Sequence, residues 1–268
     1  MAVCLIDSVM GPLGFYNICL KVDDLDGTVA FYRGLGFEPT GEDAPGLRVS
    51  LANGADALTF MTFLDADLIN FRGAHIHRLM CEIEAAGMAV TGYNAIPEEQ
   101  PLMLDETGEP LPENECGHFT VHDPDGHELF FNTHPPERAP FESAMAAGRN
   151  NGDRASRRLL GRLIYGLDVT DLNASGVFYE TLGLEVVRDA DDAWVTPPAR
   201  HRAAHFVLRL RQSDRAGSLL RFYGPTAGES AMRAWGFTKD GTKWLGNDPD
   251  GHPLEILPNQ SLPDVWML

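Results

Sequence analysis

Cysteine is scarce in this chain, and long apolar runs are missing. Only four of the 268 residues are cysteines, Cys4, Cys19, Cys81 and Cys116, and no two of them form a CxxC pair. Disulfide-rich domains have cysteines at regular, paired spacings, and these four do not show such spacings. We therefore expect reduced thiols. No stretch reaches the roughly 20 apolar residues of a membrane span, and the start MAVCLIDSVMGPLG lacks the pattern of a signal peptide. These absences predict a cytoplasmic protein that does not enter a membrane.

Positive charge is also scarce. The chain has 21 Lys and Arg against 39 Asp and Glu, which gives a formal net charge of −18. Like charges repel before contact forms, so this balance disfavours binding to nucleic acid or to an anionic membrane surface. We expect a small-molecule substrate or ligand as the partner, with a homodimer left open.

What the chain does have is a repeated strand-to-helix signature. The segment KVDDLDGTVAFYRGLGFE (21–38) matches DVTDLNASGVFYETLGLE (168–185) after a shift of 147 residues. Alternating apolar residues predict a strand before the signature, Asp24 can cap the helix that follows, and Gly36 can end it. We expect Phe31 and Leu35 to be the buried residues of that helix.

A second signature follows each copy of the first. HDPDGHELFF (122–131) matches NDPDGHPLEI (247–256) after a shift of 125 residues. Asp-Pro-Asp-Gly suits a type I turn, and an apolar strand should follow it. His127 and His252 hold equivalent places, and we interpret both as structural turn or surface groups. The extra residues of the first copy, 97–116, are acidic and contain prolines, which leaves a solvated loop and a lid as alternatives.

The two signatures divide the chain into a first module at 1–134, a linker at 135–158 rich in Pro, Gly and Asn at its ends, and a second module at 159–268. Strands around single helices predict an α+β fold of tandem βαβββ modules, whose curved mixed sheets carry the helices on their outer face.

This combination of motifs resembles the vicinal oxygen chelate superfamily, which includes glyoxalases, extradiol ring-cleaving dioxygenases and bleomycin-binding proteins. The resemblance covers about 14–134 and 160–258, and a chain with two modules is most similar to the extradiol dioxygenases. It implies a divalent metal such as Fe, Mn, Ni or Zn, held by one ligand on the first strand, one on a middle strand and a Glu four residues after the glycine of the DPDG turn.

Most positions that the resemblance assigns to the metal carry poor ligands. The first strands have Asn17 and Ile164, and the last strands have Phe130 and Glu255. A side-chain amide is a poor ligand for iron or zinc, and isoleucine is none. Glu255 therefore becomes the candidate metal ligand and catalytic carboxylate, with His205 as its candidate imidazole partner on a middle strand.

Other candidates surround these positions. Tyr165, beside the lost ligand at Ile164, could act as a catalytic acid if no metal is present, or could be an ordinary core residue. In the first module, Asn17, His118, Glu128 and Phe130 are candidate substrate-binding residues, because strand alternation places His118 and His122 on one face and Glu128 and Phe130 on one face. In the second, Trp194, Trp235 and Trp244 are candidate stacking walls, with Trp244 the one that we assign to substrate binding.

These residues leave two functions open. The first is a small-molecule-transforming enzyme with a degenerate metal site, most like an extradiol dioxygenase or a glyoxalase-type lyase or isomerase. The alternative is a metal-free protein that binds and sequesters an aromatic or antibiotic ligand.

Overall fold

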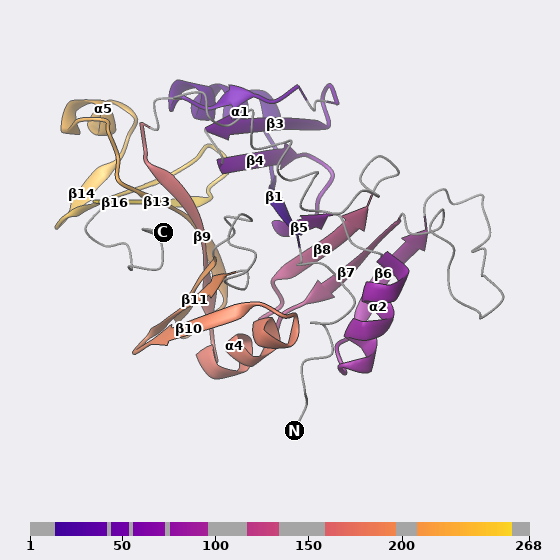
Figure 1. Cartoon of the computed structure of the whole chain (residues 1–268). Helices are drawn as coiled ribbons and strands as arrows, with labels where there is room; N and C mark the ends of the chain where they lie inside the picture. The colour runs from indigo at the N-terminus through magenta and orange to yellow at the C-terminus, as the bar shows by residue number, and fades with distance from the viewer. Residues whose placement is uncertain are drawn as a thin grey trace. The chain divides into compact units, whose positions relative to one another are not determined.

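The computed structural model describes residues 14–41, 44–53, 56–72, 76–95, 117–133, 159–196 and 208–258. Within these ranges the order strand, helix, strand, strand, strand occurs four times along the chain. The predicted α+β class with tandem βαβββ modules is confirmed, and each half of the sequence holds two such motifs (Figure 1).

The first half of the chain builds one eight-stranded sheet of strand order β2-β3-β4-β1-β5-β8-β7-β6. Two helices, α1 and α2, accompany it; α2 lies against β6, β7 and β8 (Figure 1). The first motif is β1 (Gly14–Lys21), α1 (Leu25–Gly34), β2 (Glu38–Pro39), β3 (Arg48–Asn53) and β4 (Asp56–Met61). The second is β5 (Leu68–Arg72), α2 (Ile76–Ala85), β6 (Val90–Ala95), β7 (Gly117–His122) and β8 (Glu128–Thr133).

The second half repeats this plan with the strand order β10-β11-β12-β9-β13-β16-β15-β14. Its helix α4 packs on β10, β11 and β12. One motif is β9 (Arg162–Val169), α4 (Leu172–Thr181), β10 (Glu185–Asp189), β11 (Asp192–Thr196) and β12 (Leu208–Gln212). The other is β13 (Gly217–Tyr223), α5 (Glu229–Ala234), β14 (Thr238–Asp240), β15 (Lys243–Asn247) and β16 (Pro253–Leu257).

Local signals explain the two matched helices. The side chain of Asp24 accepts a hydrogen bond from the backbone N–H of Gly27 over 3.0 Å, and Asp171 accepts equivalent bonds at the start of α4. Gly36 follows α1 with a φ of 92°, a left-handed conformation that favours glycine. Leu35 is buried as predicted, whereas Phe31 is only partly buried and the aromatic residue that α1 buries is Tyr32.

The chain packs as two compact units, and each unit takes segments from both halves of the sequence. One unit contains Met1–Asn17, Leu68–Asn150 and Val169–Ala216, and the other contains Ile18–Asp67, Asn151–Asp168 and Gly217–Leu268. The core of the second unit therefore joins residues far apart in sequence: Phe37 meets Phe222 edge to face, with ring centroids 6.3 Å apart. The two sheets each come from one half of the sequence, whereas the compact units combine segments of both halves, and the predicted module bounds stay a prediction.

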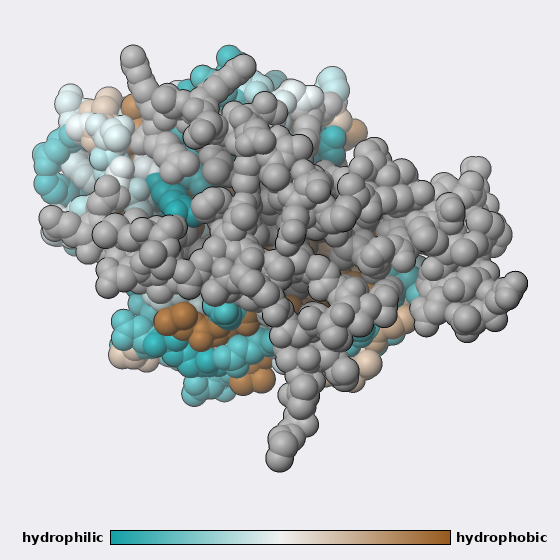
Figure 2. Space-filling model, viewed as in Figure 1, coloured by the Kyte–Doolittle hydropathy of each residue, from teal (hydrophilic) through white to brown (hydrophobic). Residues whose placement is uncertain are grey.

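Large apolar side chains exposed on the described surface are scattered. They are Leu47, Phe63, Tyr93, Val177 and Val187. In Figure 2, brown side chains lie among teal ones in the region of α4 and β10. No helix among the described residues has the length and apolar character that crossing a membrane requires.

Candidate functional site

Glu255 lies in the middle of β16 and is held by two cations. Arg221, from the neighbouring strand β13, donates a hydrogen bond from Nε to Glu255 Oε2. Lys243, from β15 on the other side, places its Nζ 3.1 Å from Oε1. Each oxygen of the Glu255 carboxylate therefore has a positively charged group beside it. Arg221 and Glu255 are both buried.

This arrangement fixes the ionisation of Glu255. Burial opposes the charged form, but the charges and hydrogen bonds of Arg221 and Lys243 outweigh it and lower the pKa of Glu255. A carboxylate with a lowered pKa is a weak proton acceptor at neutral pH. Lys243 also lies 3.8 Å from the exposed carboxylate of Asp240, so two cations face two carboxylates at this place.

The guanidinium of Arg221 is not fully used by Glu255. Its Nη1 atom is buried and has no hydrogen-bond partner among the residues that the structure describes. A buried charged donor without a partner is costly, because its desolvation is not repaid. An anionic oxygen would remove this cost.

Strand register decides which side chains share the face of Glu255. Arg221 is paired with both Glu255 and Ile164, and Leu245 is paired with Glu255, so these four lie on one face of the second sheet. Tyr165 is paired with Leu220 and lies on the opposite face, where burial raises its pKa. The structure therefore does not bring Tyr165 together with Glu255.

Trp244 also lies on the face opposite Glu255. It is paired with Ile256, and Arg233 of α5 stacks over its ring at 5.3 Å from the centroid. Lys239 lies over the same ring at 5.6 Å. Trp244 is thus covered on the helix side of the sheet, away from the ionic cluster. His205, the predicted imidazole partner of Glu255, lies outside the described residues.

A divalent metal does not fit the described residues around Glu255. Both oxygens of the carboxylate are engaged by cations, and the first-strand position beside Arg221 is Ile164, which cannot ligate. A cation at this carboxylate would also lie next to Arg221 and Lys243, whose charges repel it. Within the described ranges, no group of three His, Cys, Asp or Glu side chains is placed to hold a metal ion.

The candidate residues of the first module gather on one face of the first sheet. His118 is paired with Asn132, and Glu128 is paired with His122, across β7 and β8. Phe130 lies between them on the same face of β8, and its ring centroid is 5.4 Å from that of His118. Asn17 joins them through Asn70 of β5, whose side-chain amide donates to Asn17 Oδ1 over 3.0 Å.

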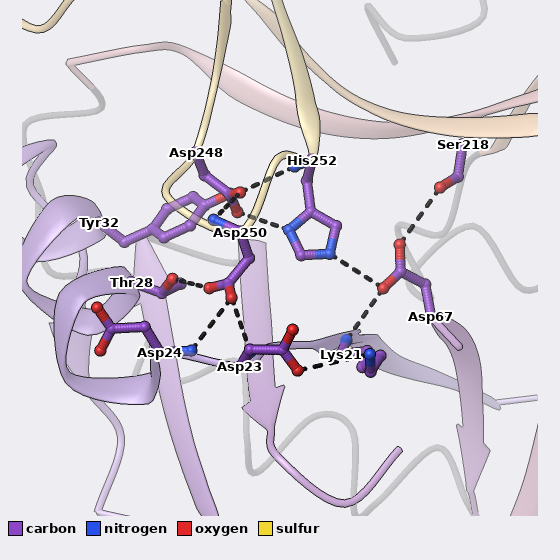
Figure 3. A network of polar contacts seen from close by, with 10 residues as sticks. All are labelled: Lys21, Asp23, Asp24, Thr28, Tyr32, Asp67, Ser218, Asp248, Asp250 and His252. Carbon is purple, nitrogen blue, oxygen red and sulfur yellow. Dashed lines mark hydrogen bonds and ion pairs between the residues drawn. The ribbon is translucent and has the colours of Figure 1, made fainter. Parts of the chain in front are cut away.

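The second DPDG turn is the centre of a different polar network (Figure 3). His252 Nδ1 is 2.8 Å from Asp248 Oδ2, and His252 Nε2 is 3.2 Å from Asp67 Oδ1. Asp67 also accepts hydrogen bonds from the Lys21 backbone and the Ser218 hydroxyl. Burial opposes protonation, but Asp248 and Asp67 outweigh it and raise the pKa of His252 to about 10. His252 is a charged structural bridge, which agrees with its interpretation as a turn residue.

Four residues of these sites were not predicted from the sequence: two cationic residues and two asparagines. Arg221 and Lys243 hold Glu255, while Asn70 and Asn132 connect to Asn17. One signal was present in the sequence: Arg221 interrupts the apolar run SLLRFY, and a buried arginine needs an acidic partner. Its partner could not be identified, because Glu255 lies 34 positions away.

Comparison with solved structures identifies the fold. The chain is similar to the Mn(II)-bound glyoxalase from Novosphingobium aromaticivorans, with 14% identity, a TM-score of 0.55, and 92% of this chain and 82% of that chain covered. It is also similar to a catechol 2,3-dioxygenase, with 14% identity, a TM-score of 0.51 and coverage of 91% and 86%. A variant of homoprotocatechuate 2,3-dioxygenase from Brevibacterium fuscum is 17% identical, with a TM-score of 0.55. The match covers 91% of this chain and 71% of that chain.

No protein-family model and no curated protein sequence matches the chain. Identities this low establish the fold and leave the activity open. The resemblance that the repeated signatures indicated is confirmed at the level of the fold, which this chain shares with a glyoxalase and with extradiol dioxygenases.

Proposed function

We propose that this chain acts on an oxygen-rich, anionic small molecule on the Glu255 face of its second sheet, with Arg221 and Lys243 supplying the positive charge at that place. The observation that carries this proposal is the buried Arg221, whose Nε is fixed by Glu255 while Nη1 has no partner among the described residues. A carboxylate or enolate oxygen satisfies that donor.

Glu255 and Arg221 have different roles in this proposed site. Glu255 orients the guanidinium through its hydrogen bond and stays ionised, and Arg221 presents a preorganised donor to the ligand. Lys243, whose side chain is 35% exposed, is the more accessible of the two cations and holds the second oxygen of Glu255. Such a site can bind an anion, and in an enzyme it would stabilise an enolate that forms next to a carbonyl group.

The competing function is a metal enzyme that uses Glu255 and His205, as the glyoxalase with bound Mn(II) suggests by its fold. The two functions predict different metal contents. Protein purified without a chelator is analysed for Fe, Mn, Ni and Zn, together with Glu255→Ala. Stoichiometric metal that disappears in Glu255→Ala would establish the metal enzyme and overturn our proposal.

Ligand binding provides the direct test. Benzoate, as a monocarboxylate probe, is titrated by calorimetry into the wild type and Arg221→Met. Loss of a buried charged contact should weaken binding by about tenfold or more. Arg209→Met is the matched control, because Arg209 also forms an ion pair within the second sheet, with Asp192. Equal affinity in the wild type and Arg221→Met contradicts the proposal. Turnover is then assayed with catechol-like and 2-oxoaldehyde substrates, with and without Fe(II).

A further inference from the structure

Three buried asparagines from neighbouring strands form a chain of amides in the first sheet. Asn132 Nδ2 donates to Asn70 Oδ1 over 2.5 Å, and Asn70 Nδ2 donates to Asn17 Oδ1 over 3.0 Å. Each of the three side chains is 4% exposed. Burying an uncharged amide costs desolvation free energy unless its donors and acceptor form hydrogen bonds. The hydrogen bonds of these three amides therefore show where that cost is offset and where it is not.

The orientation of the Asn132 amide is fixed by its neighbours. Its nitrogen faces two acceptors, Asn70 Oδ1 and the backbone carbonyl of Phe71 at 3.4 Å. A flipped amide would place oxygen against oxygen, so the nitrogen assignment follows from the network. The other atom, Oδ1, is therefore an acceptor, and it is buried without a hydrogen-bond partner among the described residues.

An aromatic pair borders this acceptor. Phe130 stands two residues before Asn132 on the same face of β8, and His118 is the cross-strand partner of Asn132 on β7. The two rings lie 5.4 Å apart at an interplanar angle of 33°, and both are only partly buried. The opposite face of these strands is closed by the stacked rings of Phe71, Phe119 and Phe131. The face of Phe130 and His118 thus combines two partly buried rings with one buried acceptor that has no partner among the described residues.

We propose that this face of the first sheet is a second ligand site, which takes a neutral planar molecule carrying an N–H donor. The donor hydrogen-bonds to Asn132 Oδ1, and the ring of the ligand lies against Phe130 and His118. The amide chain through Asn70 to Asn17 holds Asn132 in place and polarises its oxygen. This site is chemically unlike the ionic cluster of Arg221, Lys243 and Glu255, and the proposal does not depend on the function assigned to that cluster.

A pair of matched probes tests the ligand class. Benzamide has a planar ring and an N–H donor, whereas methyl benzoate has the same ring and carbonyl group but no donor. NMR titration of the full chain should show benzamide binding about tenfold more tightly, since leaving a buried acceptor unpaired costs at least this factor. Transferred and intermolecular NOEs should place the benzamide ring next to Phe130.

Two variants complete the experiment. Asn132→Leu keeps the number and branching of the side-chain heavy atoms and removes the acceptor, so benzamide and methyl benzoate should bind it equally. Phe130→Leu, at a partly buried position, should weaken both probes together. Equal binding of the probes to the wild type, absence of binding, or NOEs from benzamide to residues elsewhere would overturn the proposal. The NOE measurement needs no variant, so the test remains decisive if Asn132→Leu fails to fold.

Discussion

The phenol of Tyr32 donates a hydrogen bond to Asp248 Oδ2 over 3.1 Å, joining the first signature of one half to the second signature of the other. The reverse contact also exists: Tyr179 donates to Asp123 Oδ2 over 3.2 Å. Each tyrosine is fully buried. The repeated residues of the sequence are therefore partners of one another, and each half of the chain supplies the acceptor for the helix of the other half.

The second aspartate of each turn completes this exchange. Asp250 accepts hydrogen bonds from the backbone N–H groups of Asp23 and Asp24 and from the Thr28 hydroxyl at the start of α1 (Figure 3). Asp125 accepts from the backbone and hydroxyl of Thr170 and from Ser175, at the start of α4. Negative charge next to the first turn of a helix is stabilising. The DPDG turns thus act as helix caps supplied from a distant part of the sequence.

Tyr32→Phe should lower the free energy of unfolding by about 1–3 kcal/mol, because it removes one side-chain donor from the buried Asp248 Oδ2, which then keeps His252 alone. Urea denaturation at neutral pH measures the effect. Tyr179→Phe should give a loss of similar size. Tyr93→Phe is the control, since Tyr93 is exposed and its removal should change little. A Tyr32→Phe protein as stable as Tyr93→Phe would show that the contact is energetically unimportant.

His252 should make the stability depend on alkaline pH. Its pKa is raised from 6.5 to about 10 in the folded state by Asp248 and Asp67, against the opposing effect of burial. The folded state binds the proton more tightly than the unfolded state, so the stabilisation is complete below pH 6.5 and is lost as the pH rises through 10. Urea midpoints measured from pH 6 to 10.5 should fall more steeply for the wild type than for His252→Gln.

The loss at pH 10 should correspond to about 2 kcal/mol, the size of a hydrogen bond to a charged group. His122→Gln serves as the control because His122 is exposed beside the other DPDG turn. If its pH profile and that of His252→Gln were the same, the bridge between Asp248 and Asp67 would not be the cause.

Local signals in the sequence were enough for the fold, and they failed where partners are distant. Asp24 and Gly36 act within a few residues of themselves, so the start and end of α1 could be read directly. The second motif of each half was harder to see: its helix lacks the matched signature, and α5 has only six residues. At the site, Glu255 was found from its position after the turn, whereas its pairing with Arg221 depends on strand register, which the sequence does not display.

The two halves should depend on each other for folding. Fragments 1–134 and 159–268 each contain a complete sheet, but the buried Tyr32 and Tyr179 find their acceptors only in the other fragment. We expect each fragment alone to show no cooperative unfolding transition by circular dichroism, and an equimolar mixture to recover one. Size-exclusion chromatography should show a 1:1 complex for the mixture. Cooperative unfolding of either fragment by itself would contradict this mutual dependence.

Glu255 and Arg221 should behave as a coupled pair. Glu255→Met leaves the guanidinium of Arg221 buried, 2% exposed, with its main partner removed, so we expect a loss of about 3–5 kcal/mol in the free energy of unfolding. Arg221→Met should cost less, because Lys243 remains 3.1 Å from Glu255. The double variant removes both charges and should recover a large part of the loss, since a buried ion pair can be replaced by apolar side chains at little cost. A double-mutant cycle in urea measures the coupling, and additive losses would mean that the two side chains act independently.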